Sequence, residues 1–109
     1  MRIEGLKKSS QFTVVYKHSK STATRFVVMY YKPNGLPYNR VGYSVSKKVG
    51  KSVVRNRAKR LIREAYRLNA DHVPVGFDLV FIARVRIVEA TYQDVEKSVR
   101  RLLKELRPK

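Results

Sequence analysis

The sequence of 109 residues has no cysteine and only two histidines, His18 and His72. Without cysteine the chain cannot form disulfides, thiolate zinc sites or a cysteine nucleophile, and this composition fits a reducing, cytoplasmic location. Two histidines supply few ligands for a metal site and few groups for acid–base catalysis. We therefore expect no catalytic residue and no metal site on the protein itself.

Long apolar runs are also missing. The longest, LVFIA at Leu79 to Ala83, is as long as a strand and far shorter than a membrane span. No secretory hydrophobic region, internal repeat, linker or low-complexity segment is recognisable. The sequence predicts a single domain over residues 1–109 with no membrane partner, and nothing in it implies that the protein oligomerises.

Acidic residues are scarce, because 8 Asp and Glu stand against 25 Lys and Arg, giving a formal net charge of +17. Hydrophobic residues make up 43% of the chain, which is enough apolar material to fold. The charge therefore indicates the kind of partner rather than disorder. Among polyanions, nucleic acid is favoured over an anionic membrane surface.

Hydrophobic periodicity predicts a first helix that begins after Ser9 or Ser10 and ends near residues 18–21. Two strands follow over residues 25–32 and 40–46, and the turn-forming residues between them predict a hairpin. Both faces of the first strand are apolar, so neither face is expected simply to meet water. The first face carries Val27, Met29 and Tyr31, and the second carries Phe26, Val28 and Tyr30.

The second half of the chain predicts a helix over residues 52–68 and a buried strand over residues 77–84. A last helix is expected to start at Thr91 and Asp94, which have the spacing of a capping box. Its core positions are Val95, Val99, Leu102, Leu103 and Leu106. The fold class that follows is α+β, a small mixed sheet packed with three helices in the order α-β-β-(β)-α-β-α.

The most basic stretch, KSVVRNRAKRLIREAYR from Lys51 to Arg67, coincides with the helix over residues 52–68. Its core stripe is Val54, Ala58, Leu61, Ile62 and Ala65, and the opposite face carries Asn56, Lys59, Arg60, Arg63 and Arg67. Like charges three or four residues apart repel one another, and Arg binds phosphate in a bidentate way. This face therefore predicts binding of RNA or DNA, the alternative being a solvated face that only keeps the protein soluble.

A longer stretch, SVSKKVGKSVVRNRAKRLIRE from Ser44 to Glu64, resembles the signature of the protein subunit of bacterial ribonuclease P. LKKSSQFTVVYKHSKS at residues 6–21 and FDLVFIAR at residues 77–84 share in the resemblance. It implies a subunit that helps a catalytic RNA remove the 5′ leader from precursor tRNA. The RNA performs the hydrolysis, and magnesium is bound mainly through the RNA subunit and the substrate. The resemblance also implies a left-handed β-α-β crossover at the basic helix, against the general right-handed rule.

By this resemblance, residues in and before the basic helix face the catalytic RNA, namely Lys47, Lys48, Lys51, Arg55, Asn56, Arg57, Lys59, Arg60, Arg63 and Arg67. Arg57 lies beside the core stripe, so packing is a second role for it. The leader of precursor tRNA is expected in a cleft between the first helix and the sheet, with Phe12, Tyr16 and Tyr30 stacking on bases and Arg25 holding a phosphate. From periodicity alone, Phe12 and Tyr16 are core residues, and both interpretations stay open.

Two other classes of protein also fit the composition. One is a non-enzymatic RNA-binding protein, such as a ribosomal protein or an RNA chaperone, and the other is a DNA-binding architectural protein. Only a ribonuclease P subunit is expected to accelerate 5′ maturation of precursor tRNA when it is added to the catalytic RNA at low magnesium.

Overall fold

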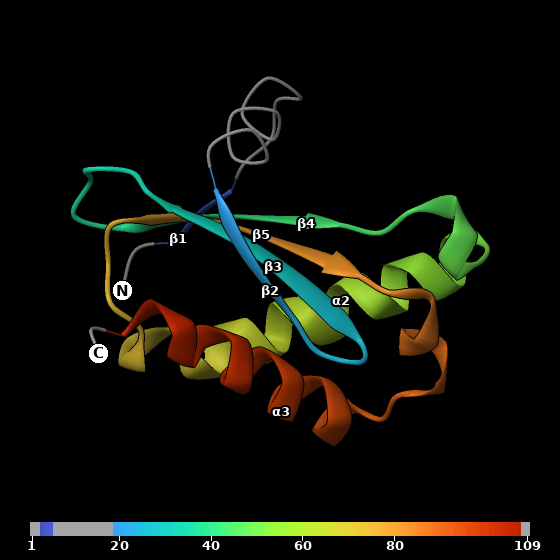
Figure 1. The fold of residues 1–109 in the computed structure, drawn as a ribbon. Helices are drawn as coiled ribbons and strands as arrows, with labels where there is room; N and C mark the ends of the chain where they lie inside the picture. The colour runs from blue at the N-terminus through green and yellow to red at the C-terminus, as the bar shows by residue number, and fades with distance from the viewer. Residues whose placement is uncertain (1–2, 6–18, 108–109) are drawn as a thin grey trace.

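The computed structural model describes residues 3–5 and 19–107, which form a mixed sheet with two α-helices on one of its faces (Figure 1). The strands are β1 (Ile3–Gly5), β2 (Lys20–Ala23), β3 (Val27–Pro33), β4 (Asn39–Ser44) and β5 (Phe77–Ala83). The helices are α2 (Ser52–Asn69) and α3 (Tyr92–Leu103). Short 3-10 turns are η1 (Lys47–Val49), η2 (Ala70–His72), η3 (Val85–Glu89) and η4 (Lys104–Leu106).

The expected α+β class is confirmed, whereas three helices are not: the described residues contain α2 and α3. The expected first helix, with Phe12 and Tyr16, lies outside the described residues. The strands β1 and β2 were not foreseen, because both are short and neither has the β-branched, aromatic composition that marked β3. The predicted helix over residues 52–68 and strand over residues 77–84 agree with α2 and β5 to within one residue.

In the described part of the chain the strand order is β1-β4-β5-β3-β2. The central strand β5 pairs parallel with β4 and antiparallel with β3. At the edges, β1 runs parallel to β4 and β2 antiparallel to β3. The predicted hairpin of β3 with β4 is therefore wrong. Turn residues between two strands show that the chain reverses, but they do not show whether a later strand inserts between them, as the strongly apolar β5 does.

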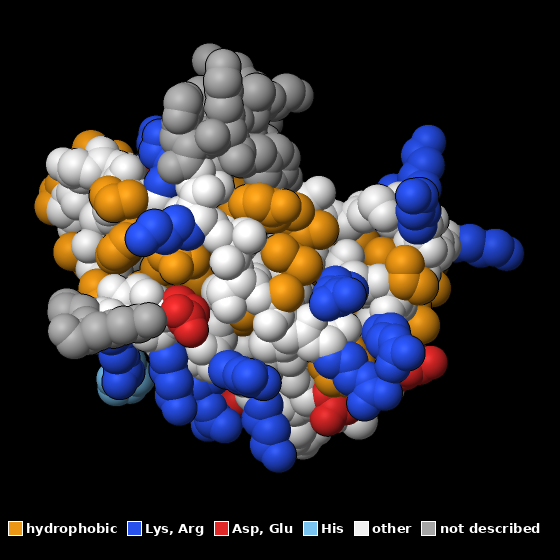
Figure 2. All heavy atoms as spheres, viewed as in Figure 1, with side chains coloured by type: hydrophobic (Ala, Val, Ile, Leu, Met, Phe, Trp, Pro, Cys, Tyr) orange, Lys and Arg blue, Asp and Glu red, His pale blue; other side chains and the backbone are white. Residues whose placement is uncertain are grey.

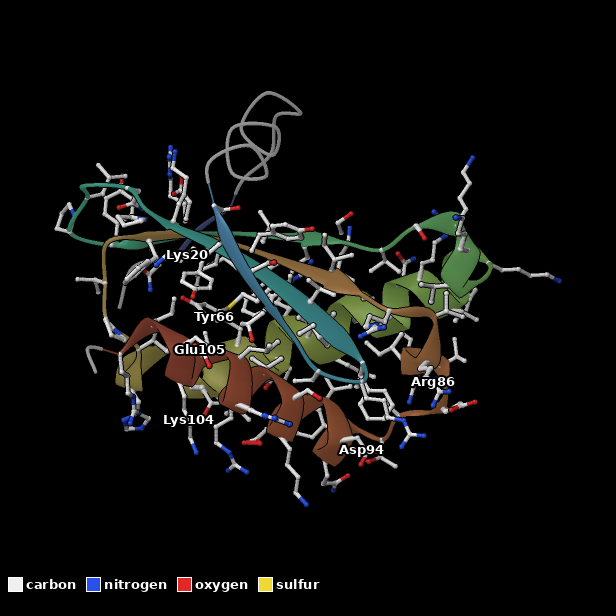
Figure 3. The ribbon with its side chains drawn as sticks, viewed as in Figure 1. Lys20, Tyr66, Arg86, Asp94, Lys104 and Glu105 are labelled. Carbon is white, nitrogen blue, oxygen red and sulfur yellow. The ribbon has the colours of Figure 1, made fainter. Side chains whose placement is uncertain are left out.

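The hydrophobic core lies between the sheet and the two helices. Val27, Met29, Leu79 and Phe81 project from β3 and β5 and are fully buried. The helices supply Ala58, Ile62, Ala65, Tyr66, Val95, Val99, Leu102 and Leu103, all buried, and Leu106 follows from η4. All five core positions expected for the last helix are thus confirmed. Tyr66 was not expected there; it lies between α2 and the sheet, 5.7 Å from the ring centroid of Phe81 (Figure 3).

One buried side chain ties the connection after α2 to the sheet. Asn39 is 0% exposed, and its Nδ2 donates to the carbonyl of Pro74 at 3.0 Å. Its Oδ1 accepts a hydrogen bond from the backbone N–H of Phe77 at 2.8 Å. The amide thereby fixes where β5 enters the sheet beside β4, because both backbone groups are satisfied by one buried residue.

The start of α3 matches the expected capping box. Thr91 Oγ1 accepts from the backbone N–H of Asp94 at 3.2 Å, and Asp94 Oδ2 accepts from the N–H of Thr91 at 2.9 Å. These hydrogen bonds are the main cause that lowers the pKa of Asp94 below its ordinary value. The carboxylate is also favourably placed at the positive end of the helix dipole.

Candidate nucleic-acid interface

The basic surface begins at a tight turn before α2. Gly50 joins η1 to α2 with φ +153°, and a Cβ on this residue would lie 3.1 Å from Cβ of Val54, so the turn favours glycine. It leaves Lys47, Lys48 and Lys51 exposed around the N-terminus of α2. The first turn of α2 contains no acidic residue, and Lys51 makes no side-chain capping bond. Backbone N–H groups and lysines therefore create one positive region.

The middle of α2 continues this positive region. Asn56, Lys59, Arg60 and Arg63 together line a shallow hollow on the side of α2 away from the core. Arg63 is held in place, because its Cζ lies 5.6 Å from the ring centroid of Tyr43 in a cation–π contact. Burial raises the pKa of the Tyr43 hydroxyl, repulsion from Tyr66 adds to the rise, and Arg63 opposes it. Tyr43 stays neutral and acts as a platform for the guanidinium.

Three other arginines that were expected to face RNA have different surroundings from Arg60 and Arg63. Arg57 donates from Nη2 to the carbonyl of Ala90 at 3.1 Å, which gives it the second, packing role. Arg67 is hydrogen-bonded to Glu64, and this contact lowers the pKa of Glu64. Arg55 is half-buried, and within the described residues its Nε has no hydrogen-bond partner.

Tyr30 lies on the opposite face of the sheet from the helices. It pairs with Val80 and Val28 pairs with Ile82, so these apolar side chains share one face. Val80 is 0% exposed there, with Tyr30 and Ile82 packed against it. The expectation that β3 has two apolar faces is thus met by Val28 and Tyr30.

Phe26 was expected on that same face and lies elsewhere. It packs against the main core with Val27 and Met29, on the helix side. The reason is that β3 begins at Val27, so Phe26 belongs to the preceding turn and does not follow the alternation of the strand.

Arg25 lies beside α3 and not beside Tyr30. Its Cζ is 5.9 Å from the ring centroid of Phe26, and it lines a hollow with Lys97, Ser98 and Arg101. Arg25 belongs to the turn before β3, whereas Tyr30 lies within β3 and packs with Val80 and Ile82, so the two side chains line different sites. Phe12 and Tyr16, the other expected leader-binding residues, lie outside the described residues.

The cations of α3 were not predicted as a site. Lys97, Arg101 and Lys104 are exposed, and Figure 2 shows Lys and Arg side chains along the side of the molecule formed by α3. Lys104 and Asp94 lie near the two ends of this helix and point away from the sheet (Figure 3). In the sequence, Lys97, Arg101 and Lys104 are visibly four and three residues apart. This spacing does not show that Arg25, from another element, lies beside Lys97 and Arg101.

In residues 3–5 and 19–107, no group of three or more His, Asp or Glu side chains could hold a metal ion. None of the helices in these residues is long and apolar enough to cross a lipid bilayer.

Comparison with known proteins shows which family the chain belongs to. The ribonuclease P family model matches residues 1–107. The chain belongs to the ribonuclease P protein family. The ribonuclease P protein component of Clostridioides difficile is 55% identical over 104 residues, covering 94% of this chain and 91% of that protein. The Caldanaerobacter subterraneus protein component is 52% identical, covering 94% and 89%.

Solved structures agree with this family. The ribonuclease P protein from Thermotoga maritima superposes with a TM-score of 0.87 at 33% identity, covering 96% of this chain and 99% of that one. The Staphylococcus aureus ribonuclease P protein gives a TM-score of 0.86 at 34% identity, covering 95% of each chain. The protein is thus the protein component of a ribonucleoprotein endoribonuclease that acts in tRNA processing, and ribonuclease P RNA is its partner.

Proposed function

We propose that η1 and the solvent face of α2 bind the ribonuclease P RNA, through Lys47, Lys48, Lys51, Arg55, Asn56, Lys59, Arg60 and Arg63. The observation that carries the proposal is the segregation of cations onto the face of α2 opposite its buried stripe, next to a helix N-terminus without acidic residues. Arg57 and Arg67 belong to the same helix, but their contacts with Ala90 and Glu64 give them a smaller share in RNA binding. Neutralising phosphates releases counterions, so the affinity falls steeply as salt rises.

We propose that the helix-free face of the sheet binds the 5′ leader of precursor tRNA. Tyr30 presents an aromatic ring there beside Val80 and Ile82, and Phe12 and Tyr16 complete the site. Stacking on aromatic rings is worth about 1–3 kcal/mol per base and tolerates any base, as leaders of varied sequence require. Arg25, which was also expected to hold a leader phosphate, lies on the side of α3 and is left out of this site.

Magnesium is bound mainly through the RNA subunit and the substrate in this proposal. The α2 surface is cationic, so it repels free magnesium while it gathers RNA phosphates, which are themselves good ligands for magnesium. By neutralising part of the phosphate charge, the protein lowers the magnesium concentration that the RNA needs. We place the activity in the cytoplasm.

We infer a left-handed connection for the crossover from β4 through α2 to β5. In Figure 1, β4 and β5 run in the same direction and α2 returns beneath the sheet between them. Followed from β4 to β5, the chain turns clockwise as it approaches the viewer, and this supports a left-handed connection. This hand differs from the usual rule for parallel units. In this connection, η1 and the basic first turn of α2 follow directly after the end of β4.

The test is reconstitution with a catalytic ribonuclease P RNA and precursor tRNA at low magnesium. We expect the protein to accelerate 5′ maturation, and the protein without RNA to leave the substrate intact. Cleavage at the mature 5′ end by nuclease-treated, repurified protein would overturn the assignment of hydrolysis to the RNA.

The leader site is tested separately with Phe12→Leu. If the ring stacks on the leader, the variant holoenzyme loses on the order of 1 kcal/mol of affinity for precursor tRNA and none for mature tRNA. Equal losses for both RNAs, or a large fall in melting temperature without a leader-dependent change, would assign Phe12 to the core.

A further inference from the structure

A second group of cations lies on the helix side of the sheet, away from the α2 hollow. Arg25 reaches it from the turn between β2 and β3, and Lys97 and Arg101 reach it from α3. Thr24, Phe26 and Ser98 complete the hollow that these three side chains surround. All three cations are exposed, and the residues lining the hollow include no acid.

The fold brings these charges together from distant parts of the sequence. Figure 1 shows the β2–β3 turn approaching α3, and Arg25 is fixed there because its guanidinium lies over the ring of Phe26. Phe26 is itself anchored in the core beside Val27. Arg25 and Lys97 both help to lower the pKa of Asp94, after the capping bonds with Thr91, which agrees with their close approach. Asp94 offsets part of the charge of Arg25 and Lys97, but the three cations outnumber this one acid, and a bound anion relieves the remaining repulsion.

We propose that this hollow binds a backbone phosphate of the ribonuclease P RNA through Arg25, Lys97 and Arg101, so that α3 forms a second contact with the same RNA. The hollow and α2 lie on the same side of the sheet, whereas Tyr30 lies on the opposite side. The α2 hollow lies toward β4 and this hollow toward the β2–β3 turn, so an RNA that binds α2 and continues across the helix layer is the polyanion that reaches it. The leader of precursor tRNA is directed to the other face.

This inference rests on the proposed RNA-binding role of α2, so its experiment keeps the two apart. The variant Lys97→Gln with Arg101→Gln removes two charges of the hollow. The matched control, Lys104→Gln with Arg107→Gln, removes the same charge from exposed residues that line a different hollow at the other end of α3. Arg60→Gln with Arg63→Gln reports on α2 in parallel.

The measurement is the affinity of each full-length protein for the ribonuclease P RNA over a range of salt concentrations, with thermal unfolding of each free protein. We expect the Lys97/Arg101 variant to bind roughly tenfold more weakly, with a salt slope smaller by about 1, and the control to change at most about twofold. The charge-retaining variant Lys97→Arg with Arg101→Lys should restore most of the affinity. If the Gln variant unfolds, Arg25→Gln, from the opposite wall, is measured in its place.

Equal losses in the hollow variant and its control would overturn the proposal and leave only general electrostatic attraction. Normal affinity for the ribonuclease P RNA, together with a holoenzyme that loses affinity for precursor tRNA, would overturn the choice of RNA. Loss of affinity in the α2 variant alone would reject the hollow while the proposed function stands. Loss in the hollow variant alone would instead reject the proposed α2 surface.

Discussion

Glu64 accepts hydrogen bonds from both Nε and Nη2 of Arg67, so the last arginine of α2 is paired with the only acid of that helix. The pair is exposed on the helix surface, and its net charge is zero. The hydrogen bond lowers the pKa of Glu64, so the carboxylate keeps its charge at neutral pH. Arg63 lies one turn and Arg60 two turns before Arg67, and the acid of α2 near them, Glu64, is already paired with Arg67.

Removing the Glu64–Arg67 pair as a unit should therefore change RNA binding little. We expect Glu64→Gln with Arg67→Gln, which conserves net charge, to stay within about twofold of wild-type affinity for the ribonuclease P RNA. Arg60→Gln with Arg63→Gln should bind at least tenfold more weakly, with a salt slope smaller by about 2. Filter binding across a salt series checks both. Equal weakening in the two variants would show that Arg67 itself contacts RNA.

Tyr30 should distinguish substrates with and without a leader. Tyr30→Leu keeps an apolar side chain against Val80 and Ile82 but removes the aromatic face. We expect the variant holoenzyme to lose about 1 kcal/mol or more of affinity for precursor tRNA with a leader of several nucleotides, and to bind mature tRNA as before. An unchanged affinity for precursor tRNA would show that the ring serves only the sheet.

Asn39 should matter for stability and not for RNA contact. Asn39→Ala leaves the Pro74 carbonyl and the Phe77 N–H without their buried partner, which costs roughly 3 kcal/mol of unfolding free energy. Asn39→Asp should also destabilise, because a carboxylate accepts from Phe77 but cannot donate to Pro74. Urea denaturation measures both losses. A loss below about 1 kcal/mol in Asn39→Ala would mean that water replaces the amide.

The free energy of unfolding should depend on the hydroxyl of Thr91, the N-cap residue of α3. Thr91→Ala removes the acceptor for the Asp94 N–H and should cost about 1 kcal/mol of unfolding free energy. Thr91→Ser, which keeps the hydroxyl, is the matched control and should lose much less. Urea denaturation at neutral pH makes the comparison, and equal losses in the two variants would remove the hydroxyl from the explanation.

Asp94 adds a pH dependence whose sign follows from its lowered pKa. An acid whose pKa is lowered by folding stabilises the fold at any pH above its ordinary pKa of 3.8. This contribution disappears as the pH falls through the lowered pKa of the folded state. Wild type should therefore be more stable than Asp94→Asn at neutral pH, and the difference should shrink below about pH 4. A difference that stays constant down to about pH 2 would contradict the assignment.

Local patterns in the sequence were enough to predict α2, β5, α3 and the capping box of α3. The signals there are short-range: a stripe repeating along the helix from Ala58 to Ala65, a continuous apolar strand, and Thr91 three residues before Asp94. The segregation of cations on α2 follows from the same periodicity. These features depend on neighbours within a turn or two of the chain.

The wrong strand pairing and the misplaced Arg25 both involve residues distant in sequence. The pairing of β3 and β4 with β5 depends on a strand that comes more than thirty residues after β4. The place of Arg25 depends on Phe26 entering the core and on α3, so no local pattern separates Arg25 from Tyr30. Tyr66 was not counted in the predicted stripe of α2, whereas its ring packs against Phe81 of β5 with 5.7 Å between the ring centroids.

The central position of β5 constrains how the molecule can be made. During synthesis β3 and β4 leave the ribosome first, yet the described sheet gives each of them β5 as its partner on the inner edge. Until residue 83 has emerged, those two inner edges carry unpaired backbone groups of the kind that bind other chains. By that time the whole of α2 has already emerged, so its cations are available to RNA before the sheet that will carry them is closed. Nascent chains thus pass through a stage in which strand edges are open while the basic helix is already complete.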